Sequence, residues 1–504
     1  MLDLVNGSSN LMCDGMRRRD FLRVASLGLG GLTLSDLMRA SAAQSPGDSY
    51  VRDKAVVLLF LAGGPSQFET FDPKPSGPEG CTSINGHIQT SLPGVRFSGY
   101  LPRLARMADR LSIVRSFQTH HAEHNGAHKQ ILTGDLTVGD GQPIREPGIG
   151  AIYARAAGAI NAETGMPRNA LLPPTTRYPG AGRGFAGAFE SVVEGAQSVY
   201  LGPSFAPVQA FATMAGGDAT VRARNNNNPR NRPEDAPNPF LDSLEAHIPG
   251  AELDARMNLL DQMDQLNRRL DNPATATFGV HQRQAVELLR SGAVRRAFDL
   301  SRESRAVLDR YDTEHFRNWD CDDNSRFMRT SPSIGFSLGR QLLLARRLCE
   351  AGCGFVTVVN ANWDFHARRG IPNIPEGMGV FAPPLDHAVS AFLEDIRQRG
   401  LEDKILLVIT GEFGRTALDR NAGRHHWPRL CPLVLAGGGL RHGQVIGESD
   451  PRGREPATEP ITIDDLHATL MHTLFDVGRM RLDVSLPARI HDRAQRGTPI
   501  RELF

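Results

Sequence analysis

Short apolar runs alternate along the chain with amphipathic segments that have the three- and four-residue spacing of helices. The run from Ala55 to Leu61 is continuous and ends in two glycines, which predicts a strand buried on both faces of a sheet. Four further apolar segments predict strands at residues 111–117, 355–359, 404–410 and 431–439. Helices are predicted between these strands, with ends near Gly352 and Gly400.

The alternation of helix and strand continues to the end of the chain. Residues 461–475 have helical spacing, and Asp464 or Asp465 is well placed to cap this last predicted helix. Such alternation predicts an α/β fold with a largely parallel central sheet. In that class of fold the active-site loops lie at the carboxyl ends of the strands.

One segment departs from this pattern. Residues 222–240 contain an asparagine run and several prolines, which predicts a mobile surface loop. Helical spacing then returns at Leu253, Met257, Leu260, Met263, Leu266 and Leu270. A second helical stretch is predicted from about Val280 to Tyr311. We therefore expect residues 222–315 to form a flexible loop and a helical insertion that covers the α/β core.

The N-terminus has the segment order of an export signal. Three arginines at residues 17–19 precede a mildly apolar run from Val24 to Leu34, and small residues follow at 40–43. The run is about half of the ~20 residues that span a bilayer. We expect a twin-arginine signal peptide over residues 1–44 and a mature domain over 45–504. The twin-arginine translocase is then a partner during export, the destination is periplasmic or secreted, and no stable membrane anchor is expected.

Charge and cysteine content exclude several classes of protein. The 57 Lys and Arg residues nearly balance the 56 Asp and Glu residues, so the chain lacks the basic surplus of a nucleic-acid-binding protein. The six cysteines show no zinc-ribbon spacing, and an odd number of them follows the signal. A disulfide framework is therefore not expected to organise the fold.

Side chains that can bind metals gather next to the predicted strands. Asp364 and His366 follow one strand, and Glu412 and Arg415 follow the next. Two further clusters consist of His120, His121, Glu123, His124, Asn125 and His128, and of Arg424, His425, His426 and Trp427. Each cluster alone has an ordinary structural interpretation. Their repetition at successive strand ends favours convergence on a divalent cation, which can polarise an ester oxygen or activate water.

The chain resembles a group of secreted, twin-arginine-exported bacterial proteins of unknown function in the alkaline phosphatase and sulfatase superfamily. The motifs that carry the resemblance span Phe60–Pro75, Glu123–Gly134, Trp363–His366, Thr410–Thr416, Gly423–Pro428 and Asp464–Leu474. The resemblance covers nearly the whole mature chain. It implies an alkaline-phosphatase-like α/β/α sandwich, one or two bound metals, and hydrolysis of phosphate or sulfate esters.

The resemblance also implies roles for individual residues. Asp364 and His366 resemble the aspartate and histidine that follow the superfamily's middle strand, and His426 resembles the last metal histidine. Glu412 stands where relatives place an aspartate. We therefore predict that these four residues bind a divalent cation, for which the sequence does not distinguish zinc, manganese and calcium.

The departures from the superfamily pattern concern the nucleophile and the first strand. His124 stands where the sulfatase layout places the cysteine or serine that becomes formylglycine, so metal-activated water is the expected nucleophile. The first strand ends in Ala62-Gly63-Gly64, where the superfamily normally has a metal-binding aspartate. Tentative metal or substrate residues are Glu69, Asp72, Ser66, Asn125 and His425.

The leading hypothesis is an exported metal-dependent hydrolase of a phosphate, sulfate or related ester on a small molecule or a glycan. His124 and His128 are candidate proton donors to the leaving group. Arg415 or Arg424 can bind the developing oxyanion through a guanidinium group. The alternative is a catalytically degenerate member that binds sulfated or phosphorylated glycans, and a metal oxidoreductase is a third hypothesis that no motif selects.

Overall fold

The computed structural model describes residues 49–174, 190–210, 212, 292–318, 336–368 and 371–504. The chain divides into two units, Met1–Arg52 and Asp53–Phe504, and every element below belongs to the second. The predicted signal peptide, the predicted loop at 222–240 and the first helix of the predicted insertion lie outside the described residues. Among the helices that are described, none is both long and apolar enough to cross a membrane.

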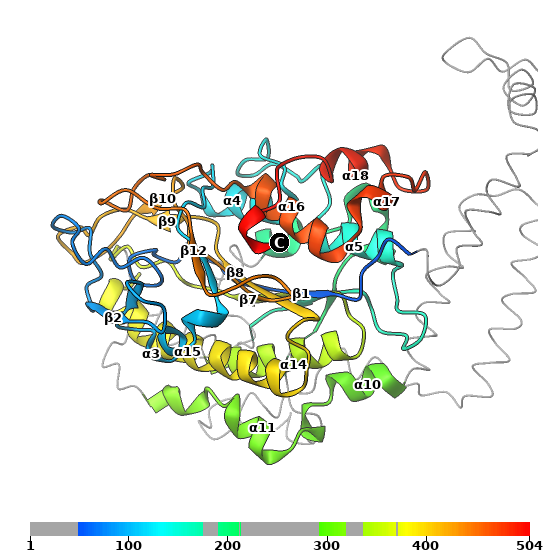
Figure 1. The fold of residues 1–504 in the computed structure, drawn as a ribbon, viewed down its shortest axis with the longest axis horizontal. Helices are drawn as coiled ribbons and strands as arrows, with labels where there is room; N and C mark the ends of the chain where they lie inside the picture. The colour runs from blue at the N-terminus through cyan, green and yellow to red at the C-terminus, as the bar shows by residue number, and fades with distance from the viewer. Residues whose placement is uncertain (1–48, 175–189, 211, 213–291, 319–335, 369–370) are drawn as a thin grey trace, which may run out of the picture. The chain divides into compact units, whose positions relative to one another are not determined.

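In the described part of the second unit, an eight-stranded sheet forms the centre (Figure 1). Its order is β12-β4-β11-β8-β1-β7-β5-β6, and every strand except β11 runs in the same direction. The pairs β2–β3 and β9–β10 are antiparallel and separate from it. The strands are β1 (Ala55–Leu61), β2 (His87–Gln89), β3 (Arg96–Ser98), β4 (Ser112–Val114), β5 (Asn169–Leu172), β6 (Val208–Gln209), β7 (Phe355–Asn360), β8 (Ile405–Thr410), β9 (Gly414–Arg415), β10 (His426–Trp427), β11 (Leu433–Gly437) and β12 (Gln444–Ile446).

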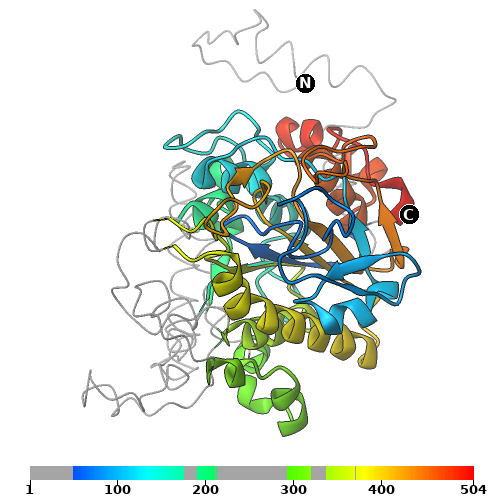
Figure 2. The same ribbon diagram turned by 90° about the vertical axis from the view of Figure 1, so that its left-hand side faces the viewer.

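Helices cover both faces of this sheet, so the described elements form three layers (Figures 1 and 2). On one face α14 packs on β1 and β7 and against α15, and on the other face α5 and α16 contact β7 and β1 respectively. The helices are α3 (Pro102–Arg106), α4 (His124–Thr133), α5 (Ile149–Ala157), α10 (Gly292–Phe298), α11 (Arg305–Arg310), α14 (Leu338–Glu350), α15 (Ile374–Gln398), α16 (Ile463–Leu474), α17 (Val477–Met480) and α18 (Ala488–Arg493).

The predicted fold class, an α/β/α sandwich with a largely parallel central sheet, is confirmed. β1 coincides with the predicted apolar run, and all of its residues are buried because helices cover both faces. β7 and β8 also lie where they were predicted and are buried throughout. β4 is shorter than the predicted strand at 111–117. The antiparallel direction of β11 was not predicted, since an apolar run gives no information on strand direction.

Helix boundaries differ from the prediction at three places. The apolar spacing predicts a helix from Pro383 to Gly400, but α15 begins at Ile374 because Asn373 and Glu376 form a capping box. Two prolines therefore lie within the helix. The prediction that an aspartate caps α16 is wrong, because Thr462 is the cap and Asp465 bonds back to its backbone N–H. The helix predicted to reach Tyr311 is interrupted between α10 and α11, where side-chain acceptors start new helical turns.

Candidate metal centre

The carboxyl ends of three adjacent parallel strands form the floor of the candidate metal centre. β1 lies between β7 and β8, and the register pairs Phe60 with Thr410, so the strands end at the same level. Glu412 follows β8, and both of its carboxylate oxygens accept the N–H of Gly63, at 2.9 and 3.1 Å. Gly63 has φ +120° and a Cβ would lie 2.5 Å from the nitrogen of Trp363, so only glycine fits here.

A first group of candidate ligands joins Glu412 to two histidines of α4. The Nδ1 of His124 lies 2.7 Å and the Nε2 of His128 lies 3.0 Å from Oε1 of Glu412. Residues four apart on a helix lie on one face, which is why both imidazoles reach the same carboxylate. Glu412 and His128 are fully buried, while His124 remains partly exposed.

A second group surrounds Asp364, which follows β7. Its Oδ2 lies 3.0 Å from Nε2 of His366 and 3.6 Å from Nε2 of His124, and its Oδ1 lies 3.3 Å from Nε2 of His426. The pairing of β9 with β10 places His426 opposite Arg415 and close to the carboxylate of Asp364. His124 therefore lies between Glu412 and Asp364 and belongs to both groups.

These side chains fit a divalent cation. The ligand atoms of His124, His128 and Glu412 all lie within 4.8 Å of one another, as do those of His124, Asp364 and His426. The buried Nε2 of His128 makes no hydrogen bond in spite of its short distance to Glu412, and neither does the buried Nδ1 of His366. Unbonded buried nitrogens are costly, and mixed nitrogen and oxygen ligands suit zinc or a similar cation.

Electrostatics keep both carboxylates ionised. Burial would raise the pKa of Asp364, but Arg415 and the surrounding histidines lower it well below its usual range. Burial would likewise raise the pKa of Glu412, and His128 and His124 lower it. Burial lowers the pKa of His124, but its interactions with the carboxylates of Asp364 and Glu412 prevail and raise it to about 9. The centre thus holds two anionic ligands in a largely buried position.

Arg415 braces the loops of this centre. Its Nε donates to the carbonyl of Gly64 at 2.6 Å, its Nη1 donates to the carbonyl of Arg424 at 2.9 Å, and its Nη2 lies 2.7 Å from Oδ1 of Asp364. The same Nη2 also donates to the carbonyl of Gly63. All three nitrogens are engaged with protein oxygens, so the geometry favours a positioning role over the predicted contact with an oxyanion.

Glu69 and Arg424 form a separate, fully buried ion pair. The Nη2 of Arg424 lies 2.8 Å from Oε1 of Glu69, and both side chains are 0% exposed. The hydroxyl of Ser83 also donates to Glu69, and the guanidinium lies over the ring of Phe68 at 4.3 Å. Ser66 accepts the N–H of Glu69 within the same turn. The structure does not bring these residues to the metal-ligand groups.

Three other predicted residues lie in different surroundings. Asp72 pairs with Lys74 and Arg115 in a pocket of its own. Asn125 is exposed beside His124. His425 lies at the rim, where its ring centroid is 6.4 Å from that of His366 and its Nε2 is 3.3 Å from Asp419. Of these residues, Asn125 follows His124 directly in the sequence, and His425 directly precedes His426.

Sequence inspection did not single out two residues that support the histidines. The hydroxyl of Ser191 lies 2.7 Å from Nδ1 of His128, and no motif surrounds Ser191. The ring of Phe413 packs against His124 and His426, with centroids 5.1 and 4.5 Å apart. Phe413 lies inside a motif that the sequence did reveal, but its packing role depends on the fold.

The fold and this centre define an α/β protein with a cluster of histidines and carboxylates at the carboxyl edge of its sheet. Residues 53–479 match the model of the family described as "Protein of unknown function (DUF1501)". The chain therefore belongs to this family. A comparison with curated proteins gives no match.

Comparison with solved structures gives remote similarities. A sulfatase from Pseudoalteromonas sp. is 12% identical with a TM-score of 0.34, over 83% of this chain and 68% of the other. A phosphonate monoester hydrolase from Silicibacter pomeroyi is 12% identical with a TM-score of 0.36, over 89% and 76%. A lipoteichoic acid synthase from Listeria monocytogenes is 8% identical with a TM-score of 0.36, over 86% and 74%.

Proposed function

We propose that the protein is an exported metal-dependent hydrolase of phosphate, sulfate or related esters. The observation that supports this proposal most directly is the convergence of four histidines and two carboxylates at one edge of the sheet. The set comprises His124, His128, His366, His426, Asp364 and Glu412. A divalent cation held there would polarise an ester oxygen and lower the pKa of a bound water.

The geometry favours ligand roles for the histidines of α4. His128 is fully buried, so its imidazole cannot reach a leaving group. A proton on its Nδ1, donated to the Ser191 hydroxyl, leaves Nε2 free to hold a cation, as outer hydrogen bonds do for metal-binding histidines. His124 contacts both carboxylates and would hold the cation with them.

Attack by water suits the surroundings better than a covalent intermediate. Ser191 is a hydroxyl that touches the centre, but it is 4% exposed and lies behind His128. His124 is on the partly exposed side of α4, at the position of the sulfatase nucleophile. The chain therefore offers imidazole nitrogen there instead of an activated hydroxyl or thiol.

The test is metal content together with turnover. We expect the purified mature protein to contain a divalent metal and to hydrolyse an aryl phosphate or an aryl sulfate. Removal of the metal by EDTA, or the substitution His426→Ala, should lower the rate by about 100-fold or more, because each removes part of the centre. His87→Ala is the matched control, because His87 is exposed on β2 and outside both ligand groups.

Two outcomes would decide against this function. Purified protein without any bound metal contradicts a metal-dependent hydrolase. Bound metal with no turnover of either ester supports the alternative, a degenerate member that binds sulfated or phosphorylated glycans. The absence of a hydroxyl at the His124 position is the observation that keeps this alternative open.

We also propose export through the twin-arginine translocase to the periplasm or the exterior. The support is the order of three segments: the arginines at residues 17–19, the apolar run from Val24 to Leu34, and the small residues at 40–43. Replacing the three arginines with lysines keeps the charge and should abolish export, with the protein retained in the cytoplasm. Cell fractionation and immunoblotting measure the distribution, and unchanged export of the lysine variant would contradict the proposed route.

A further inference from the structure

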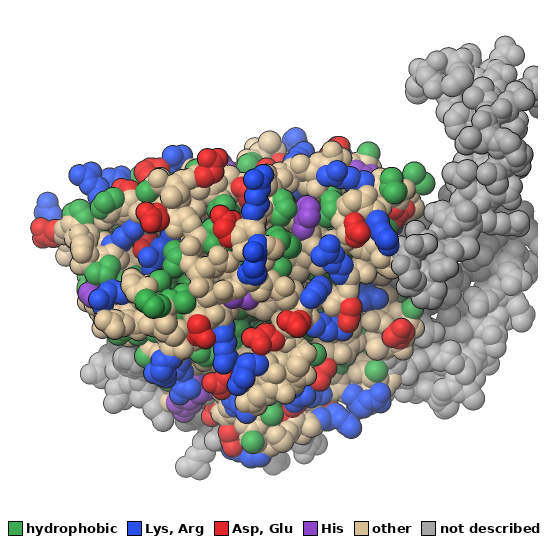
Figure 3. All heavy atoms as spheres, in the orientation of Figure 1, with side chains coloured by type: hydrophobic (Ala, Val, Ile, Leu, Met, Phe, Trp, Pro, Cys, Tyr) green, Lys and Arg blue, Asp and Glu red, His purple; other side chains and the backbone are tan. Residues whose placement is uncertain are grey.

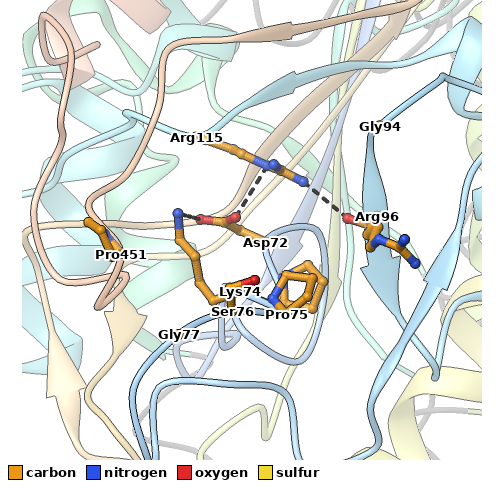
Figure 4. Close-up of a pocket in the computed structure, with 10 residues that line it drawn as sticks. Asp72, Lys74, Pro75, Ser76, Gly77, Gly94, Arg96, Arg115 and Pro451 are labelled. Carbon is orange, nitrogen blue, oxygen red and sulfur yellow. Dashed lines mark hydrogen bonds and ion pairs between the residues drawn. The ribbon is translucent and has the colours of Figure 1, made fainter.

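A second polar pocket lies at the carboxyl end of β4 (Figure 4). Its volume is about 340 Å³, which falls within the ~300–1,000 Å³ of sites that bind small molecules. The loop after β1 supplies Asp72 and Lys74, β3 begins with Arg96, and Arg115 directly follows β4. Prolines of the surrounding loops complete the walls.

Positive charge predominates in this pocket. The Nζ of Lys74 lies 3.3 Å from Oδ2 of Asp72, and the Nε of Arg115 lies 3.4 Å from its Oδ1 (Figure 4). Asp72 is buried and also accepts the hydroxyl of Ser449, so it serves as a fixed counter-ion. Lys74, Arg96 and Arg115 are three cations against this one carboxylate, which leaves an excess of two positive charges.

The cations are held in place while some of their donors remain available. Lys74 donates to the carbonyl of Ser449 at 2.9 Å and adopts φ +51°, a conformation uncommon for a residue with a side chain. Arg115 donates through Nε and Nη2 to the carbonyls of Phe71 and Arg96. Within the described part of the chain, Nη1 of Arg115 and the guanidinium of Arg96 make no hydrogen bond. Guanidinium groups bind tetrahedral oxyanions well because two N–H groups match two oxygens.

The strand register places this pocket near the candidate metal centre. Leu433 of β11 pairs with Thr410 of β8 on one side and with Val114 of β4 on the other. Neighbouring strands lie about 4.8 Å apart, so Val114 and Thr410 are about 10 Å apart. Arg115 follows Val114, and Glu412 comes shortly after Thr410. The pocket and the centre therefore lie at the same edge of the sheet, after strands that are separated by β11 alone.

We propose that Lys74, Arg96 and Arg115 form a subsite for a second anionic group, a sulfate or phosphate monoester, on a substrate whose scissile ester lies at the metal centre. The identity of the substrate rests on the proposed function, whereas anion binding by the pocket does not require turnover. On the face shown in Figure 3, basic and acidic side chains are interspersed. The excess of positive charge in the pocket suits a discrete anionic group.

The test measures binding of defined disaccharides to the purified mature protein by isothermal titration calorimetry. One probe carries a sulfate group on each ring, a second carries a single sulfate, and a third pair carries phosphates in the same positions. Arg96→Glu should weaken binding of the doubly sulfated or doubly phosphorylated probe by about tenfold or more, the effect of a lost charge-assisted hydrogen bond. It should leave binding of the singly substituted probes unchanged. The ester that shows this dependence identifies the preferred anion.

The matched control is Arg397→Glu. Arg397 is exposed in the last turn of α15, which leads into the amino end of β8 and so lies at the opposite edge of the sheet. This variant should bind every probe as the wild type does. Lys74→Gln provides a second pocket variant with the same expected loss if Arg96→Glu folds poorly.

Unchanged affinity of the pocket variants for both doubly substituted probes, or an equal loss in Arg397→Glu, would overturn the subsite. Failure of the subsite and failure of the proposed function give different results. Binding that depends on Arg96 without any hydrolysis supports the pocket and contradicts the hydrolase. If the wild type and the variant both hydrolyse singly and doubly substituted substrates with the same KM, the hydrolase is supported. The proposed subsite is then contradicted.

Discussion

Replacing Glu412 with glutamine is expected to lower the affinity for a divalent cation by about 100-fold or more. The carboxylate contacts both histidines of α4 and accepts the N–H of Gly63, so the amide fits the same space but lacks the charge. Loss of outer-shell partners alone lowers metal affinity by about 10–100-fold in metalloproteins, and a direct ligand contributes more. Calorimetric titration with zinc and with manganese measures the change.

Glu394→Gln is the control for this substitution, because Glu394 is exposed on α15 and belongs to neither ligand group. It should bind the cation as the wild type does. Circular dichroism of Glu412→Gln without metal shows whether the variant remains folded. A folded Glu412→Gln protein with unchanged affinity for both cations would remove Glu412 from the candidate centre.

The substitution Arg424→Met is expected to lower the free energy of unfolding by about 3–5 kcal/mol. Arg424 and Glu69 are both 0% exposed and make a hydrogen-bonded ion pair. Without the guanidinium, Glu69 either stays charged and unpaired in the interior or takes up a proton, and both outcomes are unfavourable. Urea denaturation followed by tryptophan fluorescence measures the change.

The double variant Glu69→Gln/Arg424→Met should recover much of this loss, because no buried charge then remains. The exposed pair of Arg429 and Glu455 provides the control, since its side chains are 52% and 44% exposed. Arg429→Met should change the free energy of unfolding by less than about 1 kcal/mol. Equal effects of Arg424→Met and Arg429→Met would show that the buried pair does not stabilise the fold.

The sequence predicted five strands of the eight-stranded sheet but not β5, β6 and β12, and it predicted the helix boundaries less well. β1, β7 and β8 are continuous apolar runs, and burial on both faces produces this pattern directly. The early start of α15 and the Thr462 cap of α16 depend on a few side-chain hydrogen bonds. Such local bonds compete with other acceptors and are difficult to predict from periodicity alone.

For the candidate site, the sequence indicated chemical groups that the structure brings close together, but it did not indicate all of their contacts. Asp364, His366 and Glu412 follow strands that were predicted, and in the structure they lie near His426. Glu69 was only a tentative metal or substrate residue, and its sequence surroundings do not show that Arg424 is its partner. His124 was expected to transfer protons, and the structure places it between the two candidate ligand carboxylates.

The sequence by itself determined the layered α/β class and the gathering of metal-type side chains after successive strands, because burial and strand ends impose patterns along the chain. Only the tertiary structure decided which carboxylates meet histidines, which meet arginines, and where Asp72 joins a basic pocket. The physical reason is distance along the chain: Glu412 reaches α4 and Glu69 reaches Arg424 through folding of segments that lie far apart in sequence. Parallel strands bring their ends together, but the connecting loops decide which side chains meet there.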